Sequence, residues 1–308
     1  MFRTTFLYLS NAGWSRKFVT NLGLARKAAR RFVAGETLEE AVEAARELNK
    51  KGLLVSLDQL GESVHNEQQA NRATDEYIGL MEAIKANELR ASSSVKLTQL
   101  GLDISDDLCL NNMRRLLTKA KELSVTVTID MESTAYTDRT IQIFRTLRQE
   151  FDNVGTVIQA YLYRSEADME QLAAEGARVR LCKGAYKEPA DKAFPQKADV
   201  DDNYVKLVHK YMTAENIQHG AYLEVATHDP KMIDAARQHV TKHNISADKF
   251  EFQMLYGIRT ATQLELAQQG YQVRVYVPYG TEWYPYFMRR LAERPANVWF
   301  IAKNFFTK

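Results

Sequence analysis

The sequence predicts an α/β barrel in which eight parallel strands alternate with helices. Eight short runs rich in β-branched and aromatic residues are separated by segments with helical spacing of apolar residues. Eight is the number of strands that closes such a barrel. A doubly wound open sheet is the alternative, but it usually opens with a glycine-rich phosphate turn after its first strand. This chain has no such turn, so the barrel is favoured.

The composition is that of an ordinary globular protein with a sizeable core. The chain has 308 residues, of which 45% are hydrophobic and 26% charged. A formal net charge of +2 gives no reason to expect a nucleic-acid partner. The cysteines, Cys109 and Cys182, supply neither a metal-ligand spacing nor a disulfide framework, which fits a reducing compartment. No run is long enough for a membrane span or signal peptide, so we expect a cytoplasmic location, with peripheral contact at the inner membrane face left open.

The chain reads as one domain, because no Pro/Gly/Ser-rich linker interrupts it and all six prolines lie at or after Pro189. Residues 1–50 are predicted to form an N-terminal helical arm packed on the barrel. Apolar residues at helical spacing mark a helix within it: Leu38, Ala41, Val42, Ala45 and Leu48. Residues 51–308 are predicted to form the barrel itself.

The barrel strands follow in order, each bounded by a helical segment or turn. The candidates are residues 53–57, 95–97, 125–130, 157–160, 179–182, 222–227, 250–255 and 273–277. The intervening helices carry apolar positions such as Tyr77, Leu80 and Met81 after the first strand and Met113, Leu116 and Leu117 after the second. Residues 187–200, which contain Pro189 and Pro195, are either a mobile lid or an ordered loop.

Residues 284–295 form a last helix with two different faces. One face is apolar and consists of Trp283, Tyr284, Phe287, Met288 and Leu291. The opposite face carries Tyr286, Arg289, Arg290 and Glu293. Two adjacent guanidinium groups can grip one planar anion, although a solvated face with an Arg–Glu pair is the simpler interpretation. The position of this helix directly after the eighth strand favours the anion site.

Polar side chains gather where the predicted strands end, which is where the chemistry of such barrels takes place. Taken singly, each has a simple structural explanation. Lys96 could pair with Asp130, Asp130 could cap the next helix, Arg180 and Lys183 could bind phosphate, and His228 could begin a helix. Taken together, burying so many charged side chains would cost several kcal/mol each unless they were paired or bound a ligand. The set therefore predicts an anionic ligand with polar edges in a deep pocket.

Several of these segments together resemble proline dehydrogenase. They are residues 180–186 (RLCKGAY), 226–228 (ATH), 252–257 (FQMLYG), 276–280 (YVPYG) and 286–294 (YFMRRLAER), and the resemblance runs in order from about residue 53 to 295. The length is similar to the stand-alone bacterial enzymes. Lys187 follows Tyr186 where some relatives carry an aromatic residue.

The resemblance implies a distorted (βα)8 barrel that holds FAD, with its last helix over the barrel mouth. It implies hydride transfer from L-proline to the flavin, giving Δ1-pyrroline-5-carboxylate, with Asp130 and Arg180 as catalytic residues. The implied substrate-binding residues are Lys96, Leu255, Tyr276, Tyr286, Arg289 and Arg290. The implied cofactor-binding residues are Met131, Gln159, Arg180, Lys183, Gly184, Ala185, Thr227, His228 and Glu293. Implied partners are a membrane quinone as electron acceptor and a separate pyrroline-5-carboxylate dehydrogenase. No metal is implied.

Three other functions remain open on the sequence. An aldolase-type barrel would use Lys96 or Lys183 as a Schiff-base nucleophile. A folate-reductase type of FAD barrel would take electrons from NAD(P)H. A non-catalytic protein could bind an amino acid or another anion through the same charged residues. The first would be trapped by borohydride, the second would be reduced by NADH, and the third would contain no flavin.

Overall fold

The computed structural model describes residues 28–61 and 64–293, with side chains up to Leu291. Eight parallel strands form a closed barrel, which confirms the predicted fold class. The ring closes where Leu54–Gln59 of the first strand pairs in register with residues 274–279 of the last. The strands are β1 (Leu54–Gln59), β2 (Ala91–Val95), β3 (Val127–Ile129), β4 (Val154–Gln159), β5 (Arg178–Cys182), β6 (Tyr222–Ala226), β7 (Phe250–Leu255) and β8 (Val273–Tyr279).

The second strand lies several residues earlier than predicted. Residues 95–97 were expected to form it, but β2 begins at Ala91, and Leu97–Leu100 is a 3-10 turn. The strand consists mainly of three serines, which have no β-branched side chain to signal a strand. They are buried in the barrel, where the hydroxyl of Ser94 lies 2.9 Å from that of Ser56 on β1. Lys96 therefore lies just beyond the strand, at the barrel mouth.

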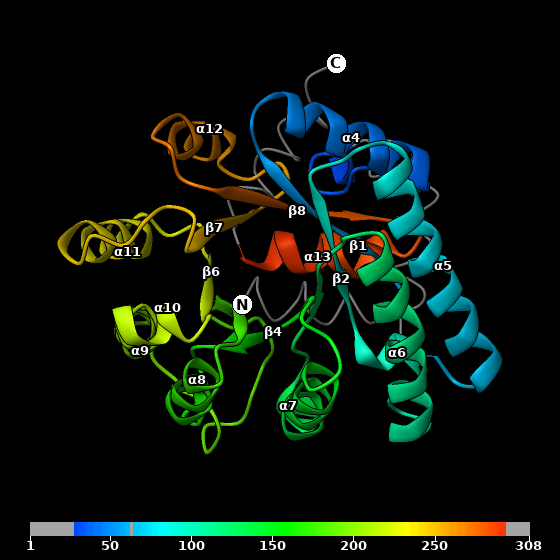
Figure 1. Ribbon diagram of the computed structural model, residues 1–308, viewed down its shortest axis with the longest axis horizontal. Coiled ribbons are helices and arrows are strands. Elements are labelled where there is room, and N and C mark those ends of the chain that lie inside the picture. The colour runs from blue at the N-terminus through cyan, green and yellow to red at the C-terminus, as the bar shows by residue number, and fades with distance from the viewer. Residues whose placement is uncertain (1–27, 62–63, 294–308) are drawn as a thin grey trace.

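A ring of helices covers the outside of the barrel, as Figure 1 shows. They are α5 (Glu67–Ala86), α6 (Asp106–Glu122), α7 (Thr134–Arg148), α8 (Ser165–Ala174), α9 (Lys197–Tyr211), α10 (Ala214–Gln218), α11 (Pro230–Lys242) and α12 (Thr260–Gln268). The predicted N-terminal helix is α4 (Leu38–Lys50), which begins with a capping box between Thr37 and Glu40. Its buried face packs against β1 and β8. It thus covers the outer position between the first and last strands. None of the described helices is both long and apolar enough to cross a bilayer.

The last helix, α13 (Trp283–Glu293), crosses the barrel opening instead of packing outside the ring (Figure 1). The predicted apolar face is buried: Trp283, Tyr284, Phe287, Met288 and Leu291 pack with Phe32, Val33, Leu60 and Ile258. Because α4 already covers the seam between β8 and β1, α13 is free to close the mouth. Its Tyr286, Arg289 and Arg290 then face the interior of the pocket.

The segment that precedes α4 is fixed against the loop after β7. Gly257 has a φ of +70°, and a Cβ placed there would lie 1.7 Å from the backbone oxygen of Arg31. The Gly257→Ala variant should therefore lose stability twice, through left-handed strain of about 1–2 kcal/mol and through the clash. Gly270→Ala is the matched control, since Gly270 has a φ of +88° but open space around it. Urea unfolding should give a larger loss for Gly257→Ala; equal losses would show that the contact with Arg31 is unimportant.

Residues 187–196 form a loop with defined contacts, and residues 197–200 already belong to α9. The amide of Tyr163 donates to the carbonyl of Lys192 at 3.1 Å, and the amide of Phe194 donates to the carbonyl of Tyr161 at 2.8 Å. The rings of Tyr163 and Phe194 meet edge to face at 4.6 Å. Glu188 accepts a hydrogen bond from the amide of Thr134, at the start of α7. These contacts fasten the loop to the end of β4 and to α7, so that its path beside the barrel mouth is defined.

Candidate functional site

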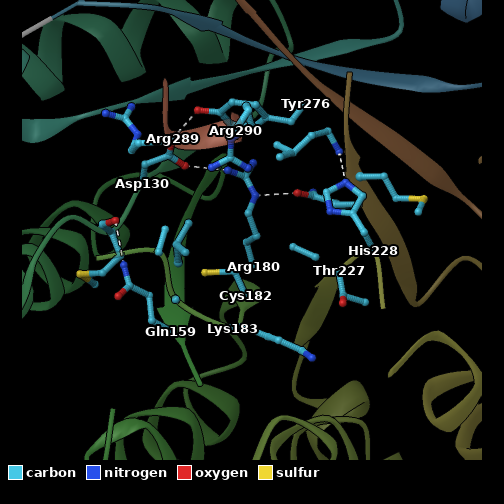
Figure 2. Close-up of a pocket in the computed structure, with 18 of the residues that line it drawn as sticks. Asp130, Gln159, Arg180, Cys182, Lys183, Thr227, His228, Tyr276, Arg289 and Arg290 are labelled. Carbon is cyan, nitrogen blue, oxygen red and sulfur yellow. Dashed lines mark hydrogen bonds and ion pairs between the residues drawn. The ribbon is translucent and has the colours of Figure 1, made fainter. Parts of the chain in front are cut away.

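A cavity of about 650 Å³ opens at the carboxyl ends of the strands, beneath α13. The structure brings the predicted site residues together in its wall: Lys96, Asp130, Met131, Gln159, Arg180, Lys183, Gly184, Ala185, Thr227, His228, Leu255, Tyr276, Tyr286, Arg289 and Arg290. Glu293 belongs to α13, but its side chain lies outside the described residues. A pocket of this size suits a small-molecule ligand. In Figure 2, Arg289, Arg290, Asp130 and Tyr276 gather at one end, and Gln159 and Lys183 lie towards the other.

Asp130 is the centre of the charged end of the pocket. One carboxylate oxygen accepts from Arg180 at 2.6 Å, and the other accepts from the hydroxyl of Tyr276 at 2.8 Å (Figure 2). The ammonium of Lys96 lies 3.7 Å from Asp130. The sequence left open whether Asp130 caps a helix or pairs with Lys96. The structure shows the ion pair with Lys96 and not a helix cap, and it gives Asp130 two closer partners that fix both of its oxygens.

Arg180 is buried and bonded on several sides. Its guanidinium donates to Gln253 at 2.6 Å and to Ser94 at 3.1 Å, in addition to Asp130, and lies 3.3 Å from Glu224. Burial opposes its charge, but Asp130 and Glu224 outweigh that effect, so its pKa lies above the ordinary value. A cation fixed in this way can stabilise negative charge in the pocket without reorganising.

Sequence reasoning missed the buried carboxylates that balance these cations. Asp58 on β1 is 1% exposed, and both of its oxygens contact Lys96, at 3.1 and 3.2 Å. Deeper in the barrel, Glu224 pairs with Arg178 at 2.9 Å, and Glu251 pairs with Arg274 at 2.6 Å. Each lies inside a strand among apolar residues, where no turn or helix signal marks it. A charge within an apolar strand run is the signal that could have found them.

The opposite end of the pocket has features that fit a flat, polar cofactor. The side-chain amide of Gln159 donates to the carbonyls of Met131 and Glu132, both at 3.1 Å. Its buried side-chain oxygen has no hydrogen-bond partner in the structure, and such an acceptor requires one. Gly184 has a φ of +114°, and a Cβ there would lie 2.4 Å from the ring of Tyr161. A glycine is therefore needed at this point of the pocket wall, because the Tyr161 ring packs against its backbone.

Lys183 and His228 have protein partners at the rim. Lys183 pairs with Asp201 and, at 2.7 Å, with Asp229, so its charge is already balanced. Asp229, rather than His228, caps α11 by accepting from the amide of Lys231. The Nε2 atom of His228 accepts from the amide of Leu255 at 2.8 Å, which places the ring proton on Nδ1. Both side chains are therefore held in fixed orientations.

The arginine pair projects from α13 into the pocket. Arg290 is 9% exposed, and its guanidinium carbon lies 5.1 Å from the ring centroid of Tyr286. Arg289 also lines the cavity. Across residues 28–61 and 64–293, no group of three or more His, Cys, Asp or Glu side chains is placed to hold a metal ion. Burial raises the pKa of the nearby Cys182 to about 12, so that it stays a thiol.

Comparison with known proteins identifies the family. The family described as proline dehydrogenase matches residues 41–303. The chain is 46% identical, over the full length of both proteins, to proline dehydrogenase 1 of Bacillus subtilis. It is 45% identical to the proline dehydrogenase of Deinococcus radiodurans, covering 90% of this chain and 89% of that one. The solved structure of proline utilization A from Bdellovibrio bacteriovorus superposes on 95% of this chain with a TM-score of 0.82 and 26% identity. The chain spans 36% of that longer protein.

Matches of this extent, together with the barrel and the charged pocket beneath its last helix, show that the chain belongs to the proline dehydrogenase family.

Proposed function

We propose that this chain is a flavoenzyme that oxidises L-proline to Δ1-pyrroline-5-carboxylate, the first step of proline catabolism, with FAD as its cofactor. The observation that carries the proposal is the arginine pair of α13, which faces a pocket end built from Asp130, Arg180 and Tyr276. Guanidinium forks bind a carboxylate with defined geometry. The fixed charges beneath them suit a reaction in which positioning and electrostatics do most of the work.

Substrate binding is assigned to the charged and aromatic end of the pocket. Arg289 and Arg290 bind the carboxylate of proline, and the ring lies between the side chains below α13. Those side chains are Lys96, Asp130, Leu255 and Tyr276, and Tyr286 of α13 covers the ring from above; all of them line the same cavity. Holding the carboxylate at the α13 end directs the far ring carbon, next to the nitrogen, towards the rest of the pocket. The ring nitrogen must be neutral before hydride leaves, so the reaction should become faster as the pH rises.

Cofactor binding is assigned to the other end. The side-chain oxygen of Gln159, which no described residue engages, suits a ring N–H donor, and Gly184 lines the same cavity. FAD supplies the acceptor for the hydride equivalent when it is bound. Arg180 then stabilises the negative charge that develops on reduction. The remaining cofactor-binding positions are Met131, Lys183, Ala185, Thr227, His228 and, outside the described side chains, Glu293. Asp201 and Asp229 already balance the charge of Lys183. Lys183 therefore orients the cofactor rather than neutralising its negative charge.

The Schiff-base alternative is disfavoured by the environment of Lys96. A nucleophilic lysine needs a lowered pKa, so that its amine is neutral. Burial lowers the pKa of Lys96, but Asp58 and Asp130 raise it above the ordinary value. Lys183 is likewise paired with two carboxylates. Lys96 is therefore held as an ammonium ion, which cannot attack a carbonyl, and the nitrogen of Lys183 is engaged by its two carboxylates.

The proposed partners follow from the reaction. Electrons leave through a membrane quinone, which requires peripheral contact with a membrane surface. The product passes to a separate pyrroline-5-carboxylate dehydrogenase. If a water-soluble quinone reoxidises the flavin after proline has reduced it, that result would support the quinone as electron acceptor.

The experiment that tests this function is anaerobic reduction. The purified protein, reconstituted with FAD, should be yellow, and L-proline should bleach the flavin absorbance whereas NADH should not. Reduction by NADH without reduction by proline would favour the folate-reductase type instead. A protein that takes up no FAD but still binds proline would be a binding protein, and the enzymatic proposal would be abandoned.

A further inference from the structure

Among the described residues, Asp58 is the closest counter-ion of Lys96, which the sequence analysis had paired with Asp130. Both oxygens of Asp58 lie within 3.2 Å of the ammonium, whereas the nearest oxygen of Asp130 is 3.7 Å away. Asp130 is also committed to Arg180 and Tyr276. The position of the ammonium is therefore determined mainly by Asp58.

The surroundings of Asp58 make it a rigid support. It is 1% exposed and lies near the end of β1, paired in register with Ser94 on β2 and with Pro278 on β8. It also lines the cavity, so its charge acts directly on the interior. A strand inside a closed barrel is among the least mobile parts of a protein, and a charge held there keeps its geometry.

Beneath the arginine pair of α13, two cations and two anions form a connected set of ion pairs. Lys96 and Arg180 are the cations, and Asp58 and Asp130 are the anions. Other titratable groups that act on Lys96 are Tyr186, which lines the same cavity, and Glu132, which follows β3. Among the residues that the structure describes, removing Asp58 would leave Lys96 with one ion-pair partner, the more distant and shared carboxylate of Asp130. A buried ammonium without a close partner is costly, so it would move or lose its proton.

We propose that Asp58 is a positioning residue, which holds Lys96 charged and in place beside the substrate ring. The role of Asp58 rests on the proposed function in one respect: that the substrate beside Lys96 is proline. Asp58 acts through Lys96, so its contribution should vanish when Lys96 is absent.

The first test needs neither substrate nor cofactor. Acetic anhydride acetylates only neutral amines, so the pH dependence of acetylation at Lys96, followed by mass spectrometry, reports its protonation. Each unit by which the pKa falls raises the neutral fraction about tenfold. Asp58→Asn should therefore be acetylated at Lys96 about tenfold faster or more than wild type at a fixed pH. Asp201→Asn, which removes a partner of Lys183, is the matched control and should leave acetylation of Lys96 unchanged. Equal rates in Asp58→Asn and wild type would overturn the proposal.

The second test measures whether Asp58 acts through Lys96. In a double-mutant cycle, Asp58→Asn should slow the reduction of flavin by proline in the wild-type background but have no effect when Lys96 is already methionine. The double variant contains neither charge, so it can be measured even if Asp58→Asn alone does not fold. Slower reduction in the double variant than in Lys96→Met would show that Asp58 acts independently. If wild type itself is not reduced by proline, the proposed function fails, while the acetylation result still decides the role of Asp58.

Discussion

The Asp130→Ala variant is expected to retain FAD but to reduce it with proline about a hundred- to a thousandfold more slowly, the usual cost of losing one preorganised electrostatic group. Asp130 fixes Arg180 through one oxygen and Tyr276 through the other. Without it, both side chains lose the contact that aims them into the pocket. Stopped-flow measurement of flavin bleaching at saturating proline gives the rate directly.

The loss of stability in Asp130→Ala should be smaller than the loss of activity. Breaking a buried ion pair usually costs about 3–5 kcal/mol, but here each cation keeps a second carboxylate. Arg180 keeps Glu224, and Lys96 keeps Asp58. Asp130→Asn, which preserves shape, separates the loss of charge from the loss of packing. If Asp130→Ala reduced flavin at the wild-type rate, the carboxylate would be structural only.

The arginine pair should matter far more for proline affinity than for folding. The apolar face of α13 is buried separately from Arg289 and Arg290, so truncating either arginine leaves that packing intact. A hydrogen bond to a charged group is worth about 1.5–3 kcal/mol, and about 1.4 kcal/mol corresponds to a tenfold change in affinity. Each Arg→Ala change should therefore weaken proline binding by about ten- to a hundredfold. A proline titration of flavin reduction in each variant measures this effect.

Arginine-to-lysine variants are the controls for the pair. Lysine keeps the charge but lacks the planar fork, so it should restore only part of the affinity. A thermal melt of each variant shows whether the helix still packs. An affinity within about twofold of wild type, together with a collapsed melting temperature, would mean that the arginines are structural and that the carboxylate is bound elsewhere.

Local pattern was sufficient to predict most of the fold. The strand Phe250–Leu255 alternates Phe250, Phe252 and Met254 with polar residues, and its predicted bounds agree with the structure. The predicted position of the serine-rich strand β2 was wrong because its serines form hydrogen bonds inside the barrel. They therefore lack the apolar pattern by which the other strands were predicted. The position of α4 between β8 and β1 depends on tertiary packing, which local periodicity does not encode.

The site was predictable only where its residues stand at strand ends or within a motif. Asp58, Glu224 and Glu251 were missed because each lies within a strand and has its counter-ion on, or directly after, another strand. The sequence analysis paired Lys96 with Asp130, but the carboxylate of Asp58 on β1 lies closer to its ammonium. Sequence separation hides such pairs, since Asp58 and Lys96 become neighbours only when β1 and β2 align.

The central claim is that the arginines hold proline so that its far ring carbon, C5, loses hydride. The most direct measurement is the anaerobic bleaching experiment repeated with L-proline deuterated at C5 and, separately, at C2. Breaking the C5–H bond predicts slower bleaching with the C5-deuterated substrate and an unchanged rate with the C2-deuterated one. Slower bleaching with deuterium at C2 alone would place the oxidised bond beside the carboxylate and contradict the account.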